Sequence, residues 1–226
     1  MSASPPAVQP AISSIRPENF PELLRQQKRW LGWWAGPLKS NGKFDKFPVD
    51  PMTGLRINPL DPANWLTLPE ALDAYRRDMA KGVGFVLSDE HPIMVSGESR
   101  YVAALDFDRC DEKRMEELEA LWRELRQPYL ELSPSGKGLH FFGLCDAPLR
   151  GGNAGDGREM YSGGRFITMT GVGAHGTLRD ISAGLVALEQ RWWPDRAAQG
   201  AGLPPQPIMA ARPETAENVA AVLSMR

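Results

Sequence analysis

The sequence predicts an α+β fold. Apolar runs of strand length recur between residues 83 and 169, and two amphipathic stretches of helix length lie at 111–126 and 181–192. With 226 residues, 42% of them hydrophobic and 24% charged, the chain can form one substantial domain or a core with a smaller module. We therefore expect helices packed against sheets around a buried apolar interior.

Composition excludes several classes of protein. The formal net charge is −2, which argues against a coat protein that binds nucleic acid by overall charge, but allows a local basic groove. Cys110 and Cys145 lie far apart and outside any CxxC pair, so neither a cysteine zinc site nor a disulfide framework is expected. Without a signal pattern or an apolar run of about 20 residues, we expect a cytoplasmic protein with no membrane partner.

The chain divides into four predicted segments. Residues 1–16 are rich in Ala, Ser and Pro and are predicted to form a disordered leader, followed by a folded domain over 17–196. Residues 197–213 have the composition of a flexible linker, and 214–226 have the pattern of a helix that stops abruptly. We expect that last segment to begin a further helical part of a longer protein.

The N-terminal elements are set by local signals. Residues 20–30 predict a short helix, 31–34 a buried strand, and the turn-rich residues 42–54 a connector. Thr67 followed by Glu70 is a capping box, which predicts a helix beginning there.

The rest of the domain reads mainly as strands. The helix at 111–126 has its apolar residues on one face, and Asp180 is the expected N-cap of the helix at 181–192. The predicted strands are residues 83–87, 101–108, 129–133, 139–144, 158–161 and 165–169.

Carboxylates stand at the end of one buried run. Asp106 and Asp108 follow Val102–Leu105, and alternation along a strand gives them the same face, about 6–7 Å apart. Such a pair can bridge hard divalent cations, and Glu159 from another strand is the natural third acid. The alternative is that the two aspartates simply end a strand and begin a turn.

A glycine-rich turn joins two predicted strands at residues 133–140. Its glycines let backbone N–H groups approach an anion, Lys137 adds positive charge, and His140 opens the next strand. The pattern differs from a Walker A loop, because glycine follows Lys137 where Ser or Thr is required. A plain hairpin with a solvated lysine and a structural histidine is the alternative. The candidate nucleotide-binding residues of the segment are Ser133, Ser135, Gly136, Lys137, Gly138 and His140.

Further basic and aromatic residues could meet phosphates. Arg165 opens an apolar strand after two glycines, and a guanidinium there could make bidentate contacts with a triphosphate. Lys46 lies in a loop with aromatic residues, and Tyr161 follows Glu159; both are candidate contacts to DNA or phosphate. A solvated strand-edge side chain is the alternative for Arg165.

In order, these motifs resemble the archaeo-eukaryotic primase superfamily. D-x-D at 106–108, S-P-S-G-x-G-x-H at 133–140, and the acid Glu159 before an aromatic residue and Arg165 are most similar to its prim-pol branch, found in phage, plasmid and mobile-element replication proteins. The N-terminal segments Lys46-Phe47-Pro48 and 82–85 are similar too. The resemblance covers about residues 20–195.

The resemblance implies a fold, an activity and a set of roles. The fold is an RRM-like antiparallel sheet packed with a smaller N-terminal α/β lobe, with the active site in the cleft between them. The activity is template-dependent DNA primase and polymerase synthesis from nucleoside triphosphates on single-stranded DNA, by two Mg²⁺ or Mn²⁺ ions. Asp106, Asp108 and Glu159 would bind the metals and His140 the nucleotide phosphates, while a fused or separate helicase is the expected partner. Many members carry Asp where this chain has Glu159.

Two other functions stay open. A metal-dependent nuclease would share the carboxylates but has less need of the glycine-rich turn and His140. A catalytically silent DNA- or origin-binding module could keep the same fold without binding nucleotide and metal together.

Overall fold

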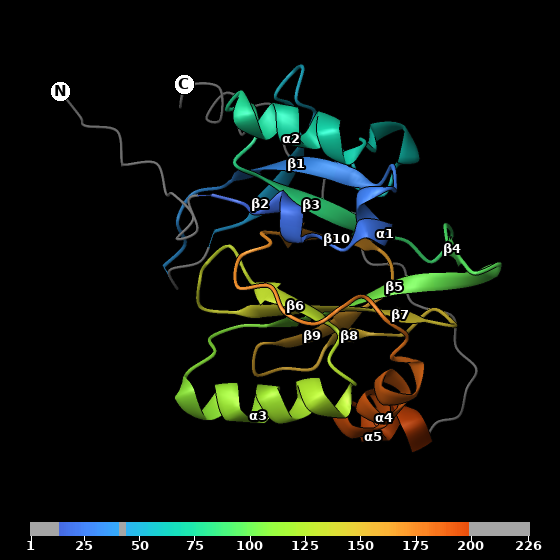
Figure 1. Cartoon of the computed structure of the whole chain (residues 1–226). Helices are drawn as coiled ribbons and strands as arrows, with labels where there is room; N and C mark the ends of the chain where they lie inside the picture. The colour runs from blue at the N-terminus through green and yellow to red at the C-terminus, as the bar shows by residue number, and fades with distance from the viewer. Residues whose placement is uncertain (1–13, 41–43, 199–226) are drawn as a thin grey trace.

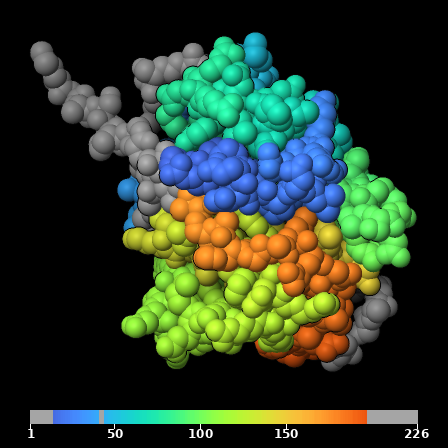
Figure 2. All heavy atoms as spheres, in the orientation of Figure 1, coloured from blue at the N-terminus to red at the C-terminus, as the bar shows by residue number. Residues whose placement is uncertain are grey.

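The computed structural model describes residues 14–40 and 44–198. The predicted α+β class is confirmed: Figure 1 shows two stacked sheets between an N-terminal helix layer and a layer of later helices. Figure 2 shows the same succession of layers in the space-filling view. Most of the predicted leader, the predicted linker beyond residue 198 and the predicted helix at 214–226 lie outside the described residues.

The first sheet has four antiparallel strands in the order β10-β3-β1-β2. All six residues of β3 are buried, as expected for a central strand with β-branched and aromatic side chains. The strands are β1 (Trp30–Ala35), β2 (Lys46–Val49), β3 (Gly82–Leu87) and β10 (Arg165–Met169).

This sheet is strongly curled. β2 and β10 are its two edges, and three strand spacings of a flat sheet would hold them about 14 Å apart. Yet Lys46 Nζ on β2 lies 3.4 Å from Thr168 Oγ1 on β10. The side chains reach each other only because the two edges bend toward the same side.

β2 corrects one prediction. Residues 42–54 are predicted to be a connector, but Lys46–Val49 pairs with β1 from Ala35 to Gly32. The turn residues that follow Val49 led to the prediction of a connector, and Pro48 lacks the N–H that a ladder needs. An edge strand tolerates proline, and β2 is an edge.

The second sheet has six strands and carries the predicted acidic residues. Its order is β6-β7-β5-β9-β8, and β4 pairs with the first part of the long strand β5. The strands are β4 (Ile93–Val95), β5 (Glu98–Phe107), β6 (Tyr129–Leu132), β7 (Leu139–Cys145), β8 (Gly152–Asn153) and β9 (Arg158–Tyr161).

The helices follow the predicted signals, with two differences. The capping box of Thr67 and Glu70 is confirmed at α2, and Asp111 caps α3 through the Arg114 amide. The segment at 20–30 is helical for only four residues, and Ile181, not Asp180, is the N-cap of α4. The elements are η1 (Pro17–Asn19), α1 (Glu22–Arg25), η2 (Pro62–Asn64), α2 (Leu68–Arg76), α3 (Glu112–Glu124), α4 (Ser182–Trp192) and α5 (Pro194–Ala198).

The two faces of β5 belong to two apolar clusters. Val102 and Ala104 pack in a cluster with residues of the first sheet, including Phe85. Ala103 and Leu105 pack instead with residues of α3 and α4. Because side chains alternate, Asp106 continues the face that turns toward the first sheet. Within the described residues, no helix combines the length and apolar character needed to cross a membrane.

Candidate active site

One row of polar side chains crosses four strands of the second sheet. Glu131 on β6 lies opposite His140 on β7, which lies opposite Asp106 on β5, which in turn lies opposite Glu159 on β9. Residues directly opposite one another in antiparallel strands share a face and have Cβ atoms about 4.5–5.5 Å apart. We call these four residues the charged row. The register thus brings together three of the predicted site residues from distant parts of the chain.

The first half of the row is buried. Glu131 is fully buried and His140 is 1% exposed, while the His140 Nδ1 atom lies 3.6 Å from Glu131 Oε1. The other ring nitrogen, Nε2, lies 3.5 Å from Asp106 Oδ1. The imidazole therefore stands between two carboxylates, with one ring nitrogen toward each.

The second half of the row is accessible. The Asp106 side chain is 29% exposed and that of Glu159 is 23% exposed. Asn153 on the neighbouring β8 donates to Glu159 Oε1 at 2.9 Å, and Arg165 Nη1 donates to Glu159 Oε2 at 3.3 Å. Arg165 comes from the first sheet, so this ion pair joins the two sheets beside Asp106.

Tyr161 is itself buried and packs beside this accessible half through Arg165. The guanidinium carbon of Arg165 lies 4.0 Å from the centre of the Tyr161 ring, an arrangement typical of a cation–π contact. Burial raises the pKa of the Tyr161 phenol, while the nearby Arg165 charge opposes that shift and Glu159 adds to it. Tyr161 therefore stays protonated and can act as a hydrogen-bond donor near the acids.

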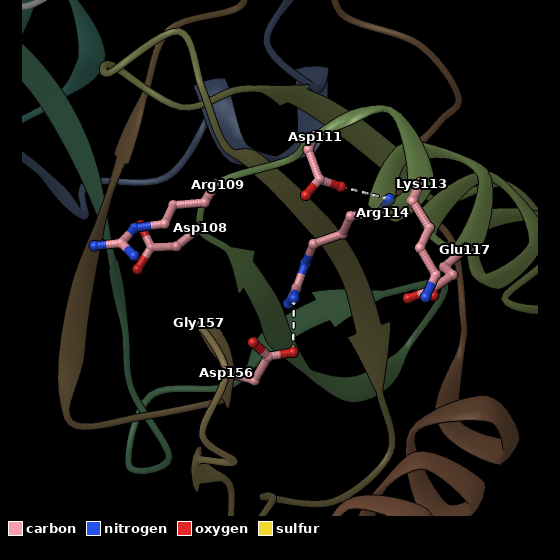
Figure 3. Close-up of a pocket in the computed structure, with 8 residues that line it drawn as sticks. All are labelled: Asp108, Arg109, Asp111, Lys113, Arg114, Glu117, Asp156 and Gly157. Carbon is pink, nitrogen blue, oxygen red and sulfur yellow. Dashed lines mark hydrogen bonds and ion pairs between the residues drawn. The ribbon is translucent and has the colours of Figure 1, made fainter.

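Asp108 lies one residue beyond the end of β5, where its backbone N–H donates to the Gly157 carbonyl at 2.8 Å. It lines a pocket of about 550 Å³ between the start of α3 and the turn before β9. Figure 3 shows Arg114 reaching across this pocket to Asp156, an ion pair of 2.9 Å.

The pocket carries charges of both signs. Four acids and three bases line it, so it has no excess of positive charge that would hold an anion. The acids are Asp108, Asp111, Glu117 and Asp156, and the bases are Arg109, Lys113 and Arg114.

The glycine-rich turn packs against the end of β5. The Cys110 N–H donates to the Lys137 carbonyl at 2.7 Å, and a Cβ on Gly138 would lie 2.5 Å from the Phe107 carbonyl oxygen. Only glycine lets the turn approach the backbone between Asp106 and Asp108 so closely. The tertiary structure therefore holds the turn beside the two aspartates.

The hydroxyls and charges of this turn are arranged locally. The Ser133 and Ser135 hydroxyls lie 2.9 Å apart, and the Lys137 N–H donates to Ser135 Oγ at 3.2 Å. Ser133 is buried, whereas Ser135, Gly136 and Lys137 are exposed. Gly136 has φ of +68°, in the left-handed region that favours glycine. Lys46 comes from β2 of the other sheet, and its Nζ reaches Thr168 on β10, the strand that carries Arg165.

Asp106, Asp108 and Glu159 supply the oxygen donors that Mg²⁺ and Mn²⁺ prefer. Across residues 14–40 and 44–198, however, no three His, Cys, Asp or Glu side chains are gathered closely enough to hold a metal ion. Glu159 is instead engaged by Arg165 and Asn153. The donor chemistry fits a divalent cation, and binding through Glu159 would require it to exchange a present partner.

The sequence reasoning missed two residues of the site. Glu131 sits in the apolar segment Tyr129–Leu132, where a single acid reads as a solvent-facing strand residue. Its burial depends on groups about forty positions later, which no local pattern reveals. Asn153 lies in a glycine-rich segment typical of a loop, and its place beside Glu159 follows only from the pairing of β8 with β9.

Comparison with known proteins adds one finding. Over 155 residues the chain is 29% identical to a DNA primase-polymerase from Nitratiruptor phage NrS-1. This chain resembles a phage primase-polymerase. The match covers 66% of the chain but only 20% of that protein, so the chain spans about a fifth of its relative's length. No protein-family model matches the chain. The resemblance to a primase-polymerase predicted from the motifs is confirmed.

Proposed function

We propose that this chain is the catalytic domain of a DNA primase-polymerase, which adds nucleotides on a single-stranded DNA template for the replication of a phage, plasmid or other mobile element. The observation that carries the proposal is the charged row beside a glycine-rich turn. The similarity of the chain to a protein named DNA primase-polymerase supports the same activity. In this proposal the six-stranded sheet corresponds to the RRM-like sheet of the archaeo-eukaryotic primases, and the site lies in a cleft between it and the N-terminal sheet.

The acids would hold the catalytic metals. Asp106, Asp108 and Glu159 would bind two Mg²⁺ or Mn²⁺ ions, which lower the pKa of the attacking hydroxyl and neutralise charge on the leaving pyrophosphate. The partial exposure of Asp106 and Glu159 supports this role, because a metal–nucleotide complex can reach them. For Glu159 to act as a ligand, at least one of its oxygens must exchange its present partner.

Other residues would bind the triphosphate. His140 Nε2 faces Asp106, so a phosphate close to the metals would meet this nitrogen. Lys137 and Arg165 supply positive charge at the turn and at β10, while Ser133, Ser135, Gly136 and Gly138 shape the turn that approaches the aspartates. A guanidinium can bind two phosphate oxygens at once. Lys46 and Tyr161 are proposed contacts to DNA or phosphate, and a fused or separate helicase is the proposed partner.

A primer-extension assay tests the proposal. The 226-residue chain is incubated with a labelled primer on single-stranded template, nucleoside triphosphates and either Mg²⁺ or Mn²⁺. We expect metal-dependent lengthening of the primer, and products on unprimed template if the chain also initiates. The Asp106→Asn variant serves as the control for a contaminating polymerase. Lack of extension with both metals would contradict the proposal.

The same assay separates the alternatives. A nuclease would shorten the labelled strand in the presence of metal without using triphosphates. A silent DNA-binding module would bind the labelled strand without changing its length. It would also show no metal-dependent binding of nucleotide. The glycine-rich turn held beside the aspartates favours the polymerase, since a nuclease has no triphosphate to bind.

A further inference from the structure

The buried end of the charged row holds a carboxylate with nearly all its acceptor positions filled. The Thr170 N–H donates to Glu131 Oε1 at 2.9 Å, and the Gly171 N–H donates to Oε2 at 2.8 Å. The Tyr129 hydroxyl also donates to Oε2, at 2.8 Å. Three fixed donors thus define the position and the plane of the Glu131 carboxylate.

These donors are themselves rigidly held. Gly171 has φ of +66°, and a Cβ there would lie 2.1 Å from the Arg16 carbonyl oxygen, so its backbone is confined. Burial raises the pKa of the Tyr129 phenol, and the Glu131 charge raises it further, so this hydroxyl remains a donor. The carboxylate is therefore a rigid acceptor and not a side chain that rotates to suit its neighbours.

One group next to Glu131 lacks a partner of its own. His140 Nδ1 is buried and, among the described residues, has no hydrogen bond within the usual distance. Glu131 Oε1, 3.6 Å away, lies just beyond that distance. Leaving a buried ring nitrogen without a partner is unfavourable, so a slight shift that closes this gap stabilises the pair. Phe142 meets the ring edge-on, with centroids 6.3 Å apart, and limits its tilt.

We propose that Glu131 is a positioning residue for His140: it accepts a hydrogen bond from Nδ1 and thereby keeps Nε2 directed at Asp106 and the incoming nucleotide. This inference rests on the proposed function for its catalytic meaning. A histidine that binds through one ring nitrogen is commonly oriented by a carboxylate on the other. Stability alone gives little reason to bury a carboxylate here, because burying a charge is costly even when it is hydrogen-bonded.

Matched variants separate positioning from a purely structural role. Glu131→Gln keeps the size of the side chain but places an amide N–H₂ where an acceptor stood. Tyr129→Phe removes one donor to Glu131 and leaves the carboxylate facing His140. We expect Glu131→Gln to raise the nucleotide KM about 10- to 100-fold with a smaller change in kcat, and Tyr129→Phe to change KM less than about threefold. Equal effects of the two variants, or a loss of kcat alone, would overturn the inference.

Nuclear magnetic resonance gives a readout that needs no activity. The chain has three histidines, so substitutions of His91 and His175 assign the ring nitrogen signals of His140. In the unsubstituted chain we expect a slowly exchanging Nδ1–H proton on His140, and in Glu131→Gln a shift of the His140 signals alone. This first measurement does not depend on the variant folding. A rapidly exchanging or absent Nδ1–H would overturn the inference.

The two tests distinguish this inference from the proposed function. If the His140 proton is observed but the chain extends no primer with either metal, the proposed function fails while the Glu131–His140 pair stands. If the chain extends primers and Glu131→Gln behaves like the unsubstituted chain, the positioning role fails and the proposed function stands.

Discussion

The two halves of the charged row differ in what surrounds them. Glu131 and His140 are buried and enclosed by fixed protein groups, whereas Asp106 and Glu159 are partly exposed. The same sheet and the same register supply both halves. The buried half can therefore orient a group, and the exposed half can exchange its partners for a substrate or a metal.

This difference also explains how a sheet can carry such a row at all. A buried charge is tolerated only when its hydrogen bonds are satisfied, and Glu131 obtains them from its strand neighbour Tyr129 and the turn after β10. Exposed acids need no such support. Substitutions can test whether Asp106 and Glu159 carry the chemistry while His140 binds the nucleotide.

Asp106 is expected to give the largest effect. Asp106→Asn keeps the shape of the side chain but removes the charge that would hold a metal, so primer extension should fall roughly 10³-fold or more. The fold should persist, because removing one of two opposed acids relieves repulsion with Glu159. Extension rate and melting temperature measure the two outcomes.

Asp73→Asn is the matched control for this variant. Asp73 is an exposed acid on α2, and it forms an ion pair with Arg77 one helical turn later. We expect its extension rate to be unchanged. Near-normal synthesis by Asp106→Asn would show that Asp106 takes no part in the reaction.

His140 should give a smaller effect that appears in binding. A charge-assisted hydrogen bond from the imidazole to a triphosphate oxygen contributes about 1.5–3 kcal/mol, so His140→Ala should weaken nucleotide affinity about 10- to 100-fold. Titration calorimetry with a non-hydrolysable triphosphate measures this affinity. His175→Ala, an exposed histidine in a loop, is the control and should bind normally. Unchanged affinity of His140→Ala would make His140 a structural strand residue.

Most of the strands could be predicted because their residues carry the signal locally. The runs predicted at 83–87, 101–108, 139–144, 158–161 and 165–169 correspond closely to β3, β5, β7, β9 and β10. The order of strands within each sheet could not be derived from periodicity, since it depends on pairings between segments far apart in the chain. In the first sheet, for example, β10 pairs directly with β3, although all the strands of the second sheet lie between them in the sequence.

The site shows the same division. Asp106, His140 and Glu159 could be found because their residue types stand out at strand ends. Glu131 could not, since an acid in a strand is ordinarily solvated and its donors come from residues 170 and 171. The ion pair between Arg165 and Glu159 could not be predicted either, because it forms only where the two sheets stack.

Substitution of Gly138 tests whether the glycine-rich turn positions the two aspartates at the end of β5. Gly138→Ala forces a Cβ against the Phe107 carbonyl, so the turn or the end of β5 must move, at a cost of about 1–3 kcal/mol in unfolding free energy. We expect a lower melting temperature together with slower extension. Gly97→Ala is the comparison: Gly97 has φ of +85° in open space within the β4–β5 hairpin, so it should lose stability without losing activity. Equal activity of the two variants would show that the turn does not position the aspartates.

In the nucleotide-free chain, Arg165 should give the smallest effect, and its substitution tests whether Glu159 can exchange its ion-pair partner for a metal. The Arg165–Glu159 pair is 40% and 23% exposed, and ion pairs of this kind contribute about 0–1 kcal/mol. Arg165→Ala releases Glu159 and removes a positive charge, so Mn²⁺ should bind about threefold more tightly to the nucleotide-free chain. Calorimetric titration with Mn²⁺ measures this change, and Arg77→Ala, which frees an exposed acid on α2, should leave the affinity as it was. An unchanged Mn²⁺ affinity in Arg165→Ala would argue that Glu159 is not a metal ligand, and would restrict the metal site to Asp106 and Asp108.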